Sequence, residues 1–146
     1  MKNGVLLLIL VIASFNSRAQ VSSDTPEGII ENFFKVYEKD GEKAAVANIY
    51  AYGDSSMQQS MKYVTDTLAH TSNNLGGKCL GSELITKKCM SGSLCYYSYL
   101  VKYRLAPLRF TFVFYKPQDK WEVMNFVFDS NAINDLAKAS KYENQK

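Results

Sequence analysis

The chain has 146 residues, enough for one hydrophobic core and too few for two, so a single domain is expected. Its 17 Lys and Arg residues outnumber its 14 Asp and Glu residues by a net charge of +3, and the basic residues form no cluster. This near-neutral balance excludes the electrostatic footprint of a protein that binds nucleic acid or an anionic membrane surface.

The first 19 residues are expected to be a signal peptide rather than part of the fold. Lys2 supplies a positive charge, residues 5–13 (VLLLILVIA) form an apolar core, and residues 17–19 form a small-x-small cleavage site. An uncleaved anchor is the alternative, but the apolar run is shorter than the ~20 residues that a spanning helix needs. Cleavage between Ala19 and Gln20 would release residues 20–146 as one periplasmic or secreted domain, without a stable membrane anchor.

Three helices are expected before the sheet, and a short one after it. Thr25 is a suitable N-cap for the first helix, with Pro26 at the first helical position and Gly41 at its end. A second helix is expected over residues 42–50, and a third follows the break at residues 53–55 and stops before Asn73. The apolar positions recur at helical spacing; in the first helix they are Ile29, Ile30, Phe33, Phe34 and Tyr37, and in the third Met57, Met61, Val64 and Leu68.

Strands are expected in the second half of the chain. Residues 94–129 alternate between apolar and polar side chains and contain two breaks, which is typical of three antiparallel strands. Another strand is expected over about residues 78–90. Helices followed by a meander of strands predict an α+β fold, in which N-terminal helices pack on a curved antiparallel sheet of about four strands.

The positions of the turns predict the register. A turn at residues 117–119 places Val113 opposite Val123, and a two-residue turn after Leu105 places Leu105 opposite Leu108. This register predicts a core face of Leu108, Phe110, Phe112, Phe114, Met124, Phe126 and Phe128. It predicts an outer face of Arg109, Thr111, Val113, Tyr115, Trp121, Val123 and Asn125.

The three cysteines matter because export implies an oxidising compartment. Cys89 and Cys95 flank a turn centred on Gly92, which sets them opposite each other and predicts a disulfide between them. Cys79 is then left over, either as a reactive or intermolecular thiol or as a small buried hydrophobic residue.

Two stretches resemble a cone-shaped superfamily. They are the helical stripe of Ile30, Phe33, Phe34 and Tyr37, and the closing strand at residues 120–128 (KWEVMNFVF). The superfamily contains nuclear transport factor two, ketosteroid isomerase and the SnoaL-like polyketide cyclases. The resemblance implies a sheet wrapped around the first helix, with a pocket at its open end. The residues expected to line that pocket are Phe33, Tyr37, Tyr99, Tyr103, Phe110, Phe112, Met124 and Phe126.

An enzyme is one alternative function for such a pocket. By the predicted register Glu83 shares a face with Tyr99 and Tyr103, so a desolvated carboxylate could act as general base beside a tyrosine acid in an isomerase or cyclase. The alternative is that Glu83 lies in water and the tyrosines belong to the core. His70 is the only histidine and no Cys-x-x-Cys motif is present, so neither a metal nor a cofactor is expected.

A homodimer through the outer face of the sheet is the other alternative. The predicted register opposes Arg104 and Arg109, and it adds an apolar patch beside them. The expected dimer surface is Arg109, Val113, Tyr115, Trp121 and Val123. The first hypothesis is therefore an exported, non-catalytic domain that binds a small apolar or amphipathic ligand, or a protein partner, through an aromatic-lined cone. The enzyme and a dimeric interaction module without ligand are its rivals.

Overall fold

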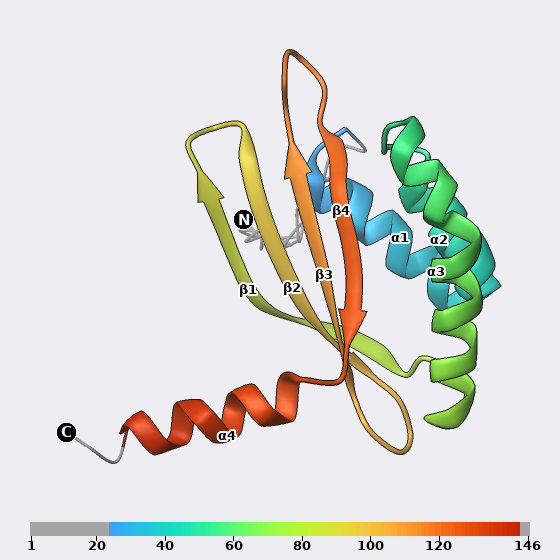
Figure 1. The fold of residues 1–146 in the computed structure, drawn as a ribbon, viewed down its shortest axis with the longest axis vertical. Coiled ribbons are helices and arrows are strands. Elements are labelled where there is room, and N and C mark those ends of the chain that lie inside the picture. The colour runs from blue at the N-terminus through green and yellow to red at the C-terminus, as the bar shows by residue number, and fades with distance from the viewer. Residues whose placement is uncertain (1–23, 144–146) are drawn as a thin grey trace, which may run out of the picture.

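The computed structural model describes residues 24–143, so the predicted signal peptide lies outside the described residues. The helices are α1 (Pro26–Asp40), α2 (Glu42–Tyr50), α3 (Ser55–Asn74) and α4 (Ala132–Glu143). The strands are β1 (Gly81–Met90), β2 (Leu94–Lys102), β3 (Leu108–Tyr115) and β4 (Glu122–Asp129). They form one antiparallel sheet in the order β1-β2-β3-β4, with α1 crossing behind it and α3 standing beside β4 (Figure 1). The predicted α+β fold is confirmed.

Local capping chemistry sets the starts and ends of the first helices. The Thr25 hydroxyl accepts a hydrogen bond from the Gly28 N–H at 3.2 Å, and Gly41, at φ 82°, ends α1 with its N–H on the carbonyl of Tyr37. The Asp54 carboxylate accepts from the Met57 N–H at 2.9 Å and starts α3. The predicted bounds of α1 and α2 are confirmed, whereas α3 continues through the asparagines that were expected to end it.

The predicted turn between β2 and β3 is wrong in length. Leu108 pairs with Val101, not with Leu105, so residues 103–107 form a loop and Arg104 does not oppose Arg109. The loop is held to the C-terminal end of α3, where the Leu105 N–H donates to the Leu75 carbonyl at 3.0 Å. The register differs from the predicted one by four residues, an even number, so the aromatic face of both strands stays on the same side.

A β-bulge at Met124 overturns the predicted faces at the start of β4. Val123 pairs with Phe114 and Asn125 with Val113, which leaves Met124 as an extra residue in the ladder. One inserted residue turns every side chain before it to the opposite face. Val123 is therefore buried and Trp121 packs against the core, while Met124 is 65% exposed. Met124 was assigned to the core face and the other two to the outer face, and these three assignments are wrong.

A second bulge, at Ile85 in β1, changes the position of Glu83. Cys89 pairs with Cys95, and the predicted disulfide between them is confirmed. Beyond the bulge Glu83 pairs with Leu100 on the outer face instead of with a core-facing residue.

Cys79 is buried, and its burial raises the pKa of the free thiol, which keeps it protonated.

Candidate ligand-binding cleft

The interior where the pocket was expected is filled with aromatic rings. Phe33, Phe110 and Phe112 have no exposed surface, and the rings of Phe33 and Phe112 lie 5.2 Å apart between centroids. The rings of Phe112 and Phe126 are stacked at 5.1 Å. These separations are those of packed aromatic pairs, so Phe33, Phe110, Phe112 and Phe126, which were predicted to line a pocket, form the centre of the core.

Two tyrosines at the end of this core form a hydrogen bond between their hydroxyl groups. The hydroxyls of Tyr37 and Tyr103 are 2.5 Å apart, and both side chains are buried. Burial raises the pKa of each hydroxyl well above its ordinary value, so both stay protonated. Tyr99 is only half-buried and faces a shallow groove between α1 and β1, beside Phe34 and Glu27.

The predicted pairing of Glu83 with these tyrosines is wrong. Glu83 lies on the outer face of the sheet, is exposed, and forms an ion pair with Lys102. Tyr99 and Tyr103 pack on the opposite side, against the helices. The bulge at Ile85 is the physical reason, because it turns Glu83 away from the core. The carboxylate and tyrosine of the enzyme hypothesis are therefore not brought together.

A half-open cleft of about 560 Å³ lies instead between α3 and β4. The helix contributes Met57, Val64 and the exposed Tyr63, and the bulged strand contributes Met124 and Val127. Two of the predicted ligand-binding residues, Met124 and Phe126, thus line a cleft at the edge of the sheet. The remaining lining residues are Tyr50, Asp54, Ser56, Ser60, Tyr115, Glu122, Val123 and Asn125.

The cleft combines apolar walls with negative charge. Among the described residues that line it, Asp54 and Glu122 are the only charged ones, and both are acidic. Hydrogen bonds from the Ser56 hydroxyl and the Met57 N–H lower the pKa of Asp54, so this carboxylate stays ionised at neutral pH. Tyr63 and Met124 are large side chains that stay exposed in this cleft, which is typical of a surface that receives a ligand.

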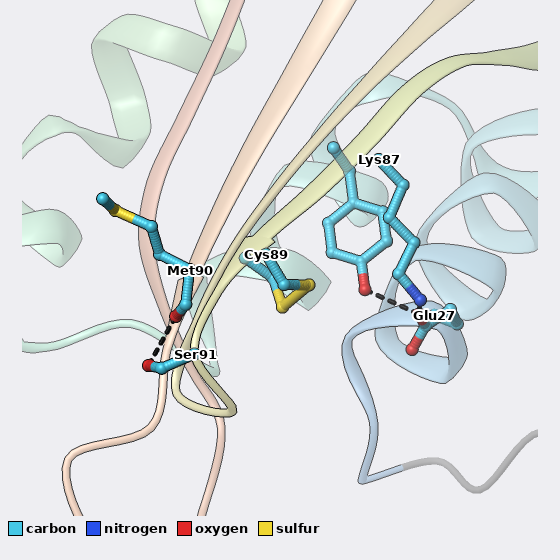
Figure 2. Close-up of a disulfide and its surroundings, with 7 residues drawn as sticks. Glu27, Lys87, Cys89, Met90 and Ser91 are labelled. Carbon is cyan, nitrogen blue, oxygen red and sulfur yellow. Dashed lines mark hydrogen bonds and ion pairs between the residues drawn. A yellow bond between two sulfur atoms is a disulfide. The ribbon is translucent and has the colours of Figure 1, made fainter.

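A second polar cluster joins α1 to the edge strand β1. The carboxylate of Glu27 accepts hydrogen bonds from the hydroxyl of Tyr97, at 2.6 Å, and from the ammonium of Lys87. Figure 2 shows Lys87 extending to Glu27 beside Cys89 of the disulfide. Burial raises the pKa of Glu27, but the bonds from Lys87 and Tyr97 outweigh it and hold the pKa below its ordinary value. The cluster therefore links α1 to the disulfide-bonded hairpin.

The lowered pKa of Glu27 predicts a specific loss of stability in acid. Its contribution is present above the ordinary value of 4.5 and is lost as the pH falls through the lower pKa of the folded state. Glu27→Gln should lower the free energy of unfolding at pH 7 by less than about 1 kcal/mol, since the group is partly exposed. It should leave stability at pH 2.5 unchanged, as measured by urea denaturation at both pH values. Glu31→Gln, on the solvent face of α1, is the control, and an equal loss at both pH values would contradict the expectation.

Only part of the predicted dimer surface lies on the outer face of the sheet. Arg109, Val113 and Tyr115 remain on the outer face, whereas Trp121 and Val123 turn inward. The charge of Arg109 is balanced within the chain, because its guanidinium bonds to Asp129 at 2.9 Å and to Asp135 of α4 at 2.5 Å. No acidic partner is needed to neutralise it.

Comparison with known proteins returns no match: no protein-family model, no curated protein and no solved structure matches the chain. The resemblance to the cone-shaped superfamily therefore stays a prediction. Within residues 24–143, no helix is long and apolar enough to cross a membrane. Over the same residues no group of three His, Cys, Asp or Glu side chains is placed to hold a metal ion.

Proposed function

We propose that the chain is an exported, non-catalytic binding domain, and that the cleft between α3 and β4 is its ligand site. The observation that carries the proposal is the combination of exposed Tyr63 and Met124 with the carboxylates of Asp54 and Glu122 in one concave site. Apolar walls with a few fixed polar groups are the usual composition of small-ligand sites. The expected ligand is therefore amphipathic, with an apolar body and a cationic group.

The aromatic interior is a weaker candidate for the same function. A ligand there would have to displace rings that are already in contact, whereas the cleft needs no such rearrangement. Phe126 belongs to both the aromatic interior and the cleft, because its ring packs on Phe112 and it also lines the cleft. The rigid aromatic core would thus hold one wall of the site in place.

Blocking the cleft tests the proposal. Ser60 lines the cleft and is exposed, so Ser60→Arg should fill it and weaken the binding of the neutral dye Nile red at least tenfold, measured by fluorescence titration. Gln59→Arg adds the same side chain next to it in α3, at an exposed residue that does not line the cleft, and should bind like the original chain. Absence of dye binding, or equal weakening in both variants, would contradict a ligand site in this cleft.

A homodimer is the second candidate function, favoured by apolar side chains that remain uncovered. Tyr96, Tyr115 and Val127 are exposed on the outer face, and Ile133 and Leu136 are exposed on α4, which extends away from the sheet (Figure 1). Exposed apolar side chains of this kind mark association sites. Sedimentation velocity should show a dimer that Tyr96→Glu converts to a monomer; a monomer at every concentration tested would exclude this function.

A further inference from the structure

The cleft runs along the edge of β4, not over one of its faces. Residues 122–127 all line it, including the core-facing Val123 and Phe126 and the outward-facing Met124 and Asn125. Successive side chains of a strand point to opposite faces, so consecutive residues can border one cleft only where it follows the strand's edge. The backbone of β4 is therefore part of the site.

β4 is an edge strand with a free side. It pairs with β3 alone, so the N–H and C=O groups that point the other way have no strand partner. The chain already uses this side once, where the Val123 N–H donates to the carbonyl of Tyr52 at 2.9 Å. That bond lies at the bulged end of the strand, and the part beyond Met124 pairs regularly with β3. The rest of this edge has the geometry to accept another extended segment.

The two edges of the sheet differ in how far they are protected. β1 carries a bulge at Ile85 and two lysines, Lys87 and Lys88, which are common devices against pairing at an edge, whereas the bulge of β4 lies near its start, at Met124, and the residues beyond it pair regularly with β3. The residues of β4 that line the cleft include no lysine or arginine. The difference indicates that the β4 edge is left open for pairing.

The charge of the cleft defines what kind of segment would fit. Asp54 lies at the start of α3 and Glu122 at the start of β4, so both walls carry a carboxylate, and no cationic side chain lines the cleft within residues 24–143. Basic side chains on an added strand would meet these carboxylates, and its apolar side chains would meet Tyr63 and Met124. An acidic segment would be repelled.

We propose that the ligand of the cleft is an extended basic peptide that adds to β4 as a fifth strand, with α3 covering its other side. The inference rests on the proposed function and names its ligand class. Main-chain hydrogen bonds to β4 supply affinity, and alternate side chains contacting the cleft supply selectivity. A segment on the order of six residues spans the available edge.

The test uses the full chain and a fluorescent seven-residue peptide of alternating valine and lysine. It should bind in a fluorescence anisotropy titration. A version with two consecutive central amides N-methylated loses donors on both of its edges and should bind at least tenfold more weakly. A version with glutamate in place of lysine should also bind at least tenfold more weakly. In ¹H–¹⁵N spectra the perturbed amides should lie along β4 and not along β1.

The outcomes separate this inference from the function on which it rests. Equal binding of the methylated peptide, or perturbation of β1 amides instead of β4 amides, would overturn strand addition. Equal binding of the glutamate peptide would overturn the basic character of the ligand. Binding of Nile red without binding of any peptide would overturn the inference and leave the ligand site in place, and failure of both probes would overturn both. Glu122→Gln with Asp54→Asn, which keeps a capping side chain at the start of α3, should weaken the lysine peptide alone.

Discussion

Replacing Phe33 with alanine is expected to lower the free energy of unfolding by about 3–5 kcal/mol. Phe33 is fully buried, and its ring contacts the aromatic rings of Phe34, Tyr37, Phe110, Phe112 and Phe126. Removing it leaves a cavity among rings that come from both α1 and the sheet and cannot all close on it. Urea denaturation followed by circular dichroism measures the loss.

The control for this variant is a leucine whose side chain is mostly exposed. Leu136 in α4 is 72% exposed, so Leu136→Ala should change stability by less than about 0.5 kcal/mol. A loss below about 1 kcal/mol for Phe33→Ala, together with altered dye binding, would mean that the interior is a pocket and not a packed core. That result would restore the original expectation of a ligand inside the cone.

The features that the sequence predicts well depend on residues close together in the chain. Thr25 and Pro26 start α1 through bonds within a few residues, and Gly41 ends it because glycine tolerates a positive φ. The disulfide joins Cys89 to Cys95 across one short turn, so its geometry follows from the hairpin alone. Such short-range effects need no knowledge of the rest of the fold.

The predictions that are wrong concern places where strands depart from strict alternation. An alternating pattern assigns side chains to the two faces of a strand only where no extra residue is inserted in that strand. Neither Ile85 nor Met124 is a glycine or shows another sequence signal of a bulge. The longer loop after β2 had no such effect, because a shift by four residues preserves the faces. The register errors of one residue placed Glu83, Val123 and Met124 on the wrong face of the sheet. The register error of four residues placed no side chain on the wrong face.

Sequence patterns could not predict the candidate cleft, for a related reason. Its helical wall was predicted correctly as a stripe containing Met57 and Val64, but the stripe does not say which strand it meets. The cleft exists because β4 is at the edge of the sheet and α3 lies beside it, and both facts are properties of the tertiary arrangement. Tyr63, which lies in the exposed part of α3, gave no sequence signal of a site.

The bulge at Met124 can be tested with two adjacent substitutions that have opposite expected effects. Val123 is 2% exposed, so Val123→Asp would bury a carboxylate without a partner and is expected to cost on the order of 4 kcal/mol of stability. Met124→Asp places the same group in water and should cost less than about 1 kcal/mol. Both values come from urea denaturation at pH 7.

The pair also distinguishes between the two registers. Without the bulge Val123 would lie on the outer face and Met124 in the core, so Met124→Asp would be the damaging variant and Val123→Asp the tolerated one. With the bulge, Met124→Asp keeps the fold but adds a third carboxylate to the cleft, beside Asp54 and Glu122. It removes the apolar contact of Met124 and adds a charge that attracts lysine, so the valine–lysine peptide should lose less affinity than the uncharged Nile red does. Equal weakening of the two probes, with stability unchanged, would mean that the charge of the cleft contributes little to the affinity for the peptide.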